Sequence, residues 1–295
     1  YAGKVISIMD TPGHNDFGED TYRILTSVDS AVMVIDGAKG IEAQTKKLFK
    51  VCSMRGIPIF TFINKIDRET KDPFDLVQEL EDVLGLPSVP VTWPIGNGLN
   101  FEGIYDILKN EVHLYKAGKT ITLGEDGVFG PELESEIAGY NLSALRDEIE
   151  LIRGAGNDFN MDLIAKGKLS PVFFGSALNN FGIELFLNYF LEMTSSPLPR
   201  MSDSGLIDTF SPDFSAFVFK IQANMNKAHR DRIAFMRICS GKFDADKEVY
   251  HVQGKKKLRL SQPQQLMAQE RKVISEAYAG DIIGVFDPGI FSIGD

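Results

Sequence analysis

The sequence is poor in cysteine and has no long apolar run. Its two cysteines, Cys52 and Cys239, lie far apart within apolar stretches, which predicts buried thiols in a reducing compartment rather than a disulfide framework. No apolar run approaches the roughly 18 residues that a membrane-spanning helix needs. The first residues also lack the charged-then-apolar pattern of a secretion signal. These absences predict a cytoplasmic protein with no membrane partner.

Positive charge is scarce as well. The chain has 31 basic and 41 acidic residues, a formal net charge of −10, which excludes a protein that coats nucleic acid through its overall electrostatics. We expect no DNA partner, and any contact with RNA must be local. The length of 295 residues and the hydrophobic content of 43% predict about two domains with substantial cores.

Short apolar runs alternate with segments of helical spacing in the first two thirds of the chain. The runs, each followed by a polar or glycine-bearing turn, are residues 4–10, 30–36, 58–64 and 170–174. Runs of this kind are typical of buried parallel strands. Apolar residues at spacings of three and four between them, as in 76–84 and 186–193, indicate helices. The predicted fold class is α/β, with a mostly parallel sheet flanked by helices.

The alternation is interrupted by a glycine-rich stretch that we interpret as a hairpin-bearing insertion at about residues 91–155. A segment rich in proline and serine, 195–212, is typical of an exposed connection between domains. Beyond it the sequence has strand-like runs and little helical spacing. We therefore predict an α/β domain of the nucleotide-binding kind over residues 1–205. An all-β domain with the strand pattern of a barrel is predicted over residues 206–295.

The first motif that carries chemistry is Asp10-Thr11-Pro12-Gly13-His14, after the predicted strand 4–10. An aspartate at the end of a strand can hold Mg²⁺ through water, and a glycine lets its backbone N–H approach a γ-phosphate closely. His14 would then lie beside that phosphate. The same pattern also occurs as an ordinary strand-to-loop turn, so the motif alone leaves both interpretations open.

The second motif is Asn64-Lys65-Ile66-Asp67, after the predicted strand 58–63. The Asp67 carboxylate can accept hydrogen bonds from both the N1 and N2 donors of guanine, a pattern that adenine does not offer. Asn64 would connect neighbouring loops, and the Lys65 stem would cover one face of the base. This motif is more specific than the first and predicts a guanine site.

The third motif is Gly175-Ser176-Ala177-Leu178, after the predicted strand 170–174. Small residues at this point would let a backbone N–H reach the O6 acceptor of guanine, although a plain strand-ending turn has the same composition. All three motifs follow predicted parallel strands, whose carboxyl ends are where open α/β sheets bind ligands. Their shared position and order favour one site for a guanine nucleotide.

Two basic clusters lie in the predicted β domain. They are residues 255–259 and residues 229–232. Lysines of this kind usually occupy a solvated loop or the edge of a sheet. Contact with phosphates of ribosomal RNA is the alternative interpretation.

The three motifs together resemble the third, fourth and fifth nucleotide motifs of the translational GTPases, a family with a P-loop NTPase-type domain followed by a translation-factor β-barrel. The connecting segments 14–23, 90–96 and 217–235 resemble the peptide chain release factor 3 family rather than elongation factor G. The resemblance covers essentially the whole chain.

This resemblance implies a set of roles. Asp10 would be linked to Mg²⁺ through water, Gly13 would sense the γ-phosphate and His14 would be catalytic by orienting the attacking water. The other expected nucleotide-binding residues are Thr11, Pro12, Asn64, Lys65, Asp67, Ser176, Ala177 and Leu178. The family binds and hydrolyses GTP on the ribosome to remove class I release factors, so the implied cofactors are GTP or GDP with Mg²⁺ and the implied partners are the ribosome and those factors.

One part of the family pattern is missing from the chain. No GxxxxGK[ST] phosphate loop and no threonine-bearing first switch occur in it. In the family both precede the segment matched by Tyr1, so we expect this chain alone to bind nucleotide weakly or not at all and to be inactive as a GTPase. Two alternatives stay open at this point: an elongation factor G-like or ribosome-protection GTPase, and a non-catalytic module that binds the ribosome without nucleotide.

Overall fold

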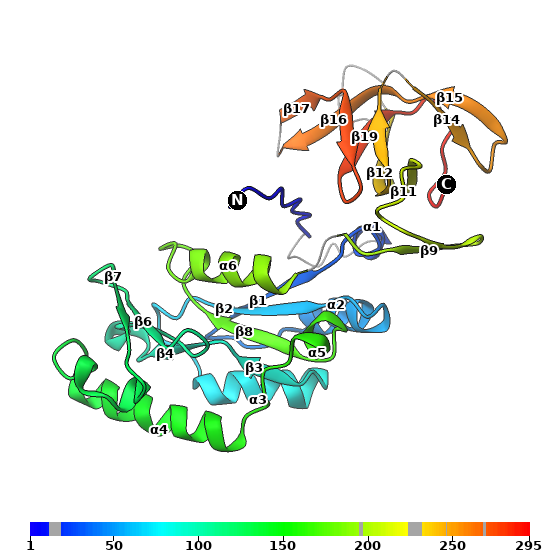
Figure 1. Cartoon of the computed structure of the whole chain (residues 1–295). Helices are drawn as coiled ribbons and strands as arrows, with labels where there is room; N and C mark the ends of the chain where they lie inside the picture. The colour runs from blue at the N-terminus through cyan, green and yellow to red at the C-terminus, as the bar shows by residue number, and fades with distance from the viewer. Residues whose placement is uncertain (12–18, 195–196, 224–231, 246, 268–269) are drawn as a thin grey trace. The chain divides into compact units, whose positions relative to one another are not determined.

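A computed structural model describes the chain except residues 12–18, 195–196, 224–231, 246 and 268–269 (Figure 1). The chain forms two compact units. Residues Ser30–Ser195 form the first, here called the parallel-sheet unit, and Tyr1–Asp29 with Ser196–Asp295 form the second, here called the antiparallel unit. Within the described residues, no helix has both the length and the apolar character needed to cross a bilayer.

The centre of the parallel-sheet unit is a four-stranded sheet. Its strands, in spatial order, are β1 (Ala31–Asp36), β2 (Ile59–Asn64), β8 (Ser170–Phe174) and β3 (Ser88–Pro90). All neighbouring strands run parallel. Both faces of such a sheet are covered, which explains why β2 and β8 are nearly continuous apolar runs. The prediction of an α/β domain with a parallel sheet is confirmed.

Helices connect the strands and cover the sheet. They are α2 (Ala43–Met54), α3 (Pro73–Leu84), α5 (Met161–Ala165) and α6 (Ile183–Met193). Local sequence explains both ends of α3: Asp72 caps its first turn by accepting a hydrogen bond from the Phe74 N–H at 2.8 Å. Gly85, with φ of 65°, ends it in the left-handed conformation that favours glycine.

Successive side chains of the strands enter two different cores. Phe62 and Phe173 lie on one face, with ring centroids 5.5 and 5.1 Å from that of Phe186 on α6. Ile63 and Phe174 lie on the other face, in a second cluster that includes residues of α3 and of the insertion. The alternation follows from the period of two along a strand, and it fixes the register of the sheet.

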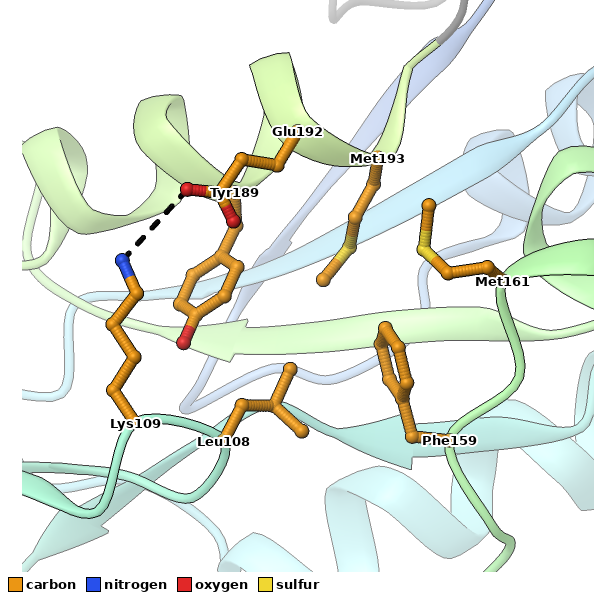
Figure 2. Close-up of a pocket in the computed structure, with 7 residues that line it drawn as sticks. All are labelled: Leu108, Lys109, Phe159, Met161, Tyr189, Glu192 and Met193. Carbon is orange, nitrogen blue, oxygen red and sulfur yellow. Dashed lines mark ion pairs between the residues drawn. The ribbon is translucent and has the colours of Figure 1, made fainter.

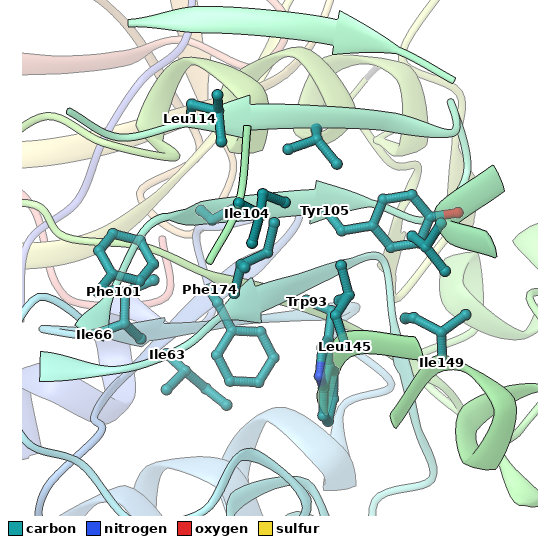
Figure 3. Packing of buried hydrophobic residues seen from close by; sticks show 14 of the residues in the cluster. Ile63, Ile66, Trp93, Phe101, Ile104, Tyr105, Leu114, Leu145, Ile149 and Phe174 are labelled. Atoms are coloured by element: carbon teal, nitrogen blue, oxygen red, sulfur yellow. The ribbon is translucent and has the colours of Figure 1, made fainter. Parts of the chain in front are cut away.

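The insertion is a second, antiparallel sheet with a long helix. Its strands, in order, are β4 (Thr92–Ile95), β5 (Gly103–Asp106), β6 (Glu111–Leu114) and β7 (Lys119–Thr122), followed by α4 (Gly139–Ala155). Short 3₁₀ turns lie at Gly98–Asn100, Gly127–Phe129 and Pro131–Leu133. Figure 3 shows Trp93 of β4 beside Leu145 and Ile149 of α4. The Trp93 Nε1–H donates to Glu148 Oε2 at 2.7 Å, so the fully buried indole has its polar partner.

The antiparallel unit has one main sheet and several short pairs. The main sheet has the order β11 (Ser215–Ala223), β12 (Arg232–Ser240), β19 (Ile282–Phe286), β16 (Ser261–Met267) and β17 (Glu270–Val273). The pairs are β9 (Arg200–Ser202) with β10 (Gly205–Ile207), β13 (Lys242–Asp244) with β18 (Glu276–Tyr278), and β14 (Glu248–His251) with β15 (Lys256–Arg259). One short helix, α1 (Glu19–Ile24), belongs to this unit. The predicted all-β character after the parallel sheet is confirmed.

A cluster of charges explains why the segment before Ser30 groups with the antiparallel unit. The buried Arg237 of β12 donates to Ser27 O at 2.8 Å and pairs with the Asp29 carboxylate. Arg200 donates to the other Asp29 oxygen at 3.0 Å and to Val28 O at 2.8 Å. Two guanidinium groups from distant parts of the chain therefore bind one short segment and its carboxylate.

The prediction of a strand at residues 4–10 is wrong. This segment has no regular structure, and the side chains of Val5 and Ile8 are 82% and 83% exposed. An apolar run becomes a strand only where a neighbouring strand supplies hydrogen-bond partners, and the parallel sheet of the described residues ends at β1. The expected domain boundary between residues 205 and 206 stays a prediction. The predicted burial of both thiols is confirmed, since Cys52 and Cys239 are free and buried.

Candidate nucleotide site

Three loops meet at one edge of the parallel sheet because they follow three neighbouring parallel strands. β1 ends at Asp36, β2 at Asn64 and β8 at Phe174. Parallel neighbours place their carboxyl ends at the same edge. The second and third sequence motifs therefore lie side by side, although more than a hundred residues separate them in the chain.

Asn64 connects the two motif loops directly. Its Oδ1 accepts one hydrogen bond from the Lys65 N–H and another from the Ala177 N–H, both at 2.8 Å. A further backbone bond runs from the Ile66 N–H to Gly175 O at 3.3 Å. One amide oxygen thus holds the loop after β2 and the loop after β8 in a fixed relation.

Lys65 is held by the aspartate that ends β1. Its Nζ lies 2.6 Å from Asp36 Oδ2, and this hydrogen bond is the main reason that the pKa of Asp36 lies below its usual range. The Lys65 backbone has φ of 70°, an uncommon conformation for a residue with a side chain. Sequence reasoning missed Asp36, whose signal was its place at the end of the apolar run 30–36.

Asp67 offers an acceptor group in the same place. Its Oδ2 accepts a hydrogen bond from Asn179 Nδ2 at 3.1 Å, and the same nitrogen lies 3.2 Å from Ser176 Oγ. Ser176 is buried, whereas Asp67 is partly exposed. A carboxylate has about four lone-pair directions, so Asp67 can accept further bonds while it keeps this one. Asn179 was also missed, and its only signal was an amide directly after the third motif.

Gly175 is required by the close packing of the loop after β8. A Cβ at this position would lie 2.5 Å from Phe62 Cζ and 2.6 Å from Phe181 O. Ser176 and Phe181 exchange backbone hydrogen bonds of 2.9 and 3.0 Å across the loop. Any larger residue at 175 would have to displace the Phe62 ring or the Phe181 backbone.

Two family profiles match the sequence of this chain. The profile described as "Elongation factor Tu GTP binding domain" matches residues 1–196, and the profile described as "Elongation factor G domain 2" matches residues 213–295. The chain belongs to the elongation factor Tu GTP-binding family. The likeness to translational GTPases inferred from the three motifs is therefore confirmed, and so is the order of an α/β domain before a β domain.

Three similar proteins of this family carry the name peptide chain release factor 3. The chain is 58% identical over 300 residues to that of Symbiobacterium thermophilum, and 53% identical to those of Gloeobacter violaceus and Ligilactobacillus salivarius. All of the chain is covered in each comparison. The chain spans 56–57% of the length of these relatives. The resemblance to release factor 3 rather than to elongation factor G is confirmed.

A solved structure supports the fold alone. The chain superposes on ttk003000868 from Thermus thermophilus with a TM-score of 0.68 at 20% sequence identity. The superposition covers 97% of this chain and 42% of the Thermus protein.

The structure brings together five of the predicted site residues: Asn64, Lys65, Asp67, Ser176 and Ala177. Leu178 belongs to the same loop, and its side chain is 75% exposed. The described residues of the first motif belong to the other unit. Asp10 and Thr11 belong to the antiparallel unit, with Asp10 exposed, and residues 12–14, which include His14, lie outside the described residues.

A pocket of about 370 Å³ occupies a different part of the parallel-sheet unit (Figure 2). Its walls are mostly apolar, with Tyr189 of α6 facing Leu108, and the Lys109 and Glu192 ion pair at one side. None of its lining residues belongs to the loops after β1, β2 and β8. The pocket and the candidate nucleotide site therefore share no residue.

Proposed function

We propose that the loops after β2 and β8 bind the guanine base of GTP or GDP. Asp67 accepts hydrogen bonds from guanine N1 and N2, the Lys65 stem lies against the ring, and the Ala177 N–H donates to guanine O6. The observation that supports this most is the bond from the Ala177 N–H to Asn64 Oδ1, which brings the two loops together. An N–H can be shared between two acceptors, so Asn64 and O6 can use this donor jointly.

The hydrogen-bonding groups of the proposed site fit guanine and disfavour adenine. Asp67 presents a carboxylate, which only accepts hydrogen bonds when ionised, and guanine offers two adjacent donors where adenine offers none in that pattern. Leu178 extends the loop beside Ala177. In the same proposal Asp10, Thr11, Pro12 and Gly13 contact the phosphates, and Asp10 holds Mg²⁺ through water.

For the protein that contains this chain, we propose ribosome-dependent GTP hydrolysis that removes class I release factors after termination. The support is the identity of 53–58% to proteins named peptide chain release factor 3 over the whole chain. This function places the protein in the cytoplasm with the ribosome and class I release factors as partners. The 295 residues contain no GxxxxGK[ST] motif, and that loop supplies most triphosphate contacts. The chain by itself is therefore proposed to bind nucleotide weakly and to be inactive.

Asp67→Asn tests guanine recognition in the full-length protein. An amide presents a donor where the carboxylate presents an acceptor, so GTP affinity should fall about 10-fold or more and xanthosine triphosphate should become the preferred ligand. Titration of both nucleotides measures the change. Asp82→Asn, an exposed carboxylate on α3, is the matched control and should leave both affinities unaltered. An unaltered preference in Asp67→Asn would remove Asp67 from the proposed role.

His14→Ala tests the proposed catalytic residue. A histidine that orients the attacking water contributes to hydrolysis and not to ground-state binding, so GTP affinity should be retained while ribosome-stimulated turnover falls about 100-fold or more. Stopped-flow binding and single-turnover hydrolysis on ribosomes separate the two effects. Equal hydrolysis rates with and without the imidazole would assign the water to another group.

A further inference from the structure

A cluster of metal-ligating side chains lies on the β5–β6 hairpin, in the insertion. Asp106 ends β5 and pairs with Glu111, the first residue of β6, while His113 follows two residues later. Side chains at positions i and i+2 of a strand, and at paired positions of neighbouring strands, share a face. One ligand atom from each of the three residues lies within 4.8 Å of the other two.

Each of the three side chains is oriented by a neighbour that is not a metal ligand. The Tyr189 hydroxyl donates to Asp106 Oδ1 at 2.7 Å, with Oδ2 at 2.9 Å, and Thr122 Oγ1 donates to Glu111 Oε1 at 3.3 Å. Thr120 Oγ1 lies 3.1 Å from His113 Nδ1. Outer contacts of this kind fix the orientation of metal ligands, and a bond at Nδ1 leaves the other imidazole nitrogen for a cation.

One atom of the cluster lacks a hydrogen-bond partner. His113 Nε2 is shielded from solvent and makes no hydrogen bond within the described part of the chain, and Glu111 Oε2 lies 3.9 Å from it. Buried polar atoms without partners oppose folding. The neighbouring Asp106 is completely buried, and its carboxylate accepts hydrogen bonds from two backbone N–H groups of the following turn as well as from Tyr189. A cation between the imidazole and the carboxylates would give His113 Nε2 a partner.

We propose that Asp106, Glu111 and His113 form a binding site for a divalent transition metal ion, with Zn²⁺ the preferred occupant. One imidazole nitrogen with two carboxylate oxygens suits Zn²⁺ better than the all-oxygen preference of Mg²⁺ or Ca²⁺. Ligand atoms of a tetrahedral zinc site are about 3.3 Å apart, so small side-chain rotations complete the site. The role is structural, because the ion would brace the hairpin against α6 through Tyr189.

Metal titration of the 295-residue chain without nucleotide tests the proposal. Co²⁺ should give visible absorption bands at one equivalent, Zn²⁺ should displace it and raise the melting temperature, and Mg²⁺ in large excess should not compete. His113→Ala and Glu111→Gln should each weaken binding by about 100-fold, and Tyr189→Phe by about 10-fold. Glu111→Gln keeps an acceptor for Thr122, so it preserves the hairpin if His113→Ala unfolds it.

Glu136→Gln is the matched control. Glu136 lies in the same insertion but pairs with Lys119, so its substitution should leave metal affinity unaltered. Failure of the wild-type chain to bind Co²⁺ or Zn²⁺ would overturn the proposal, since the three side chains would then hold no ion. Equal affinity in wild type, His113→Ala and Glu111→Gln would overturn it as well, because the ion would then be held elsewhere.

Discussion

At the scale of single residues, polar side chains at the sheet edge act in pairs across loops. Asn64 binds the backbone of Ala177, Lys65 binds Asp36, and Asp67 binds Asn179. Each pair joins two segments distant in sequence. The motif residues were predictable because their chemical type and their place after an apolar run are both visible in the sequence. Their partners Asp36 and Asn179 were not, because pairing across strands depends on the order of strands in the sheet.

The hydrogen bond between the buried Trp93 and the half-buried Glu148 gives a test of stability at this scale. Glu148→Ala leaves the indole N–H without its acceptor and should lower the free energy of unfolding by about 1–3 kcal/mol. Glu148→Gln keeps an acceptor and removes a half-buried charge, so it should be neutral or stabilising at pH 7. Chemical denaturation of the three proteins measures the difference.

The pH dependence of the same pair follows from its pKa. Burial raises the pKa of Glu148 above that of the unfolded chain, so the folded state binds this proton more tightly. The group therefore adds stability as the pH falls toward its folded-state pKa and loses that contribution at higher pH. The advantage of Glu148→Gln over wild type should shrink between pH 7 and pH 4. An advantage that grows on acidification would contradict the raised pKa.

At the scale of elements, strands and helices with strong patterns were predicted well and one strand was not. The runs that became β1, β2 and β8 and the spacing that became α3 and α6 are local signals. The run at 4–10 has the same composition, but strand formation also needs a neighbour, which composition does not report. The inward packing of the insertion on Trp93 likewise depends on contacts between segments far apart in the sequence.

The segment before Ser30 gives a prediction at this scale. Asp29 is bound by Arg200 and by the buried Arg237, so Asp29→Ala leaves a buried guanidinium without its counter-charge. The free energy of unfolding of the antiparallel unit should fall by about 3 kcal/mol. Asp203→Ala, an exposed carboxylate between β9 and β10, is the control. Equal denaturation midpoints for the two variants would show that the Asp29 cluster does not stabilise the unit.

At the scale of the whole molecule, the two interpretations of the basic cluster 255–259 differ in what its exposed lysines contact. These lysines lie on the β14–β15 hairpin, where they either face solvent or contact ribosomal RNA. Lys255, Lys256 and Lys257 are exposed on a chain whose net charge is −10, so a local basic hairpin must supply any attraction to phosphate. The other basic cluster, 229–232, lies mainly outside the described residues. Both interpretations made from the sequence, a solvated hairpin or an RNA contact, keep these side chains exposed.

Charge reversal at the hairpin distinguishes those interpretations. Lys256→Glu with Lys257→Glu in the full-length protein should weaken ribosome binding about 10-fold or more and reduce its dependence on salt concentration. Lys46→Glu with Lys47→Glu on α2 gives a control with the same change in net charge. Co-sedimentation with ribosomes at several salt concentrations measures the binding and distinguishes an RNA contact from a solvated hairpin. An unaltered salt dependence in the hairpin variant would favour the solvated hairpin.

The central claim is that the loops after β2 and β8 read guanine. A crystal structure of the full-length protein with GDP tests it most directly. We predict that Asp67 accepts hydrogen bonds from N1 and N2 of the base, that the Lys65 stem covers the ring and that the Ala177 N–H lies within hydrogen-bond distance of O6. A base bound away from these loops, or one held without contact to the Asp67 carboxylate, would contradict the account.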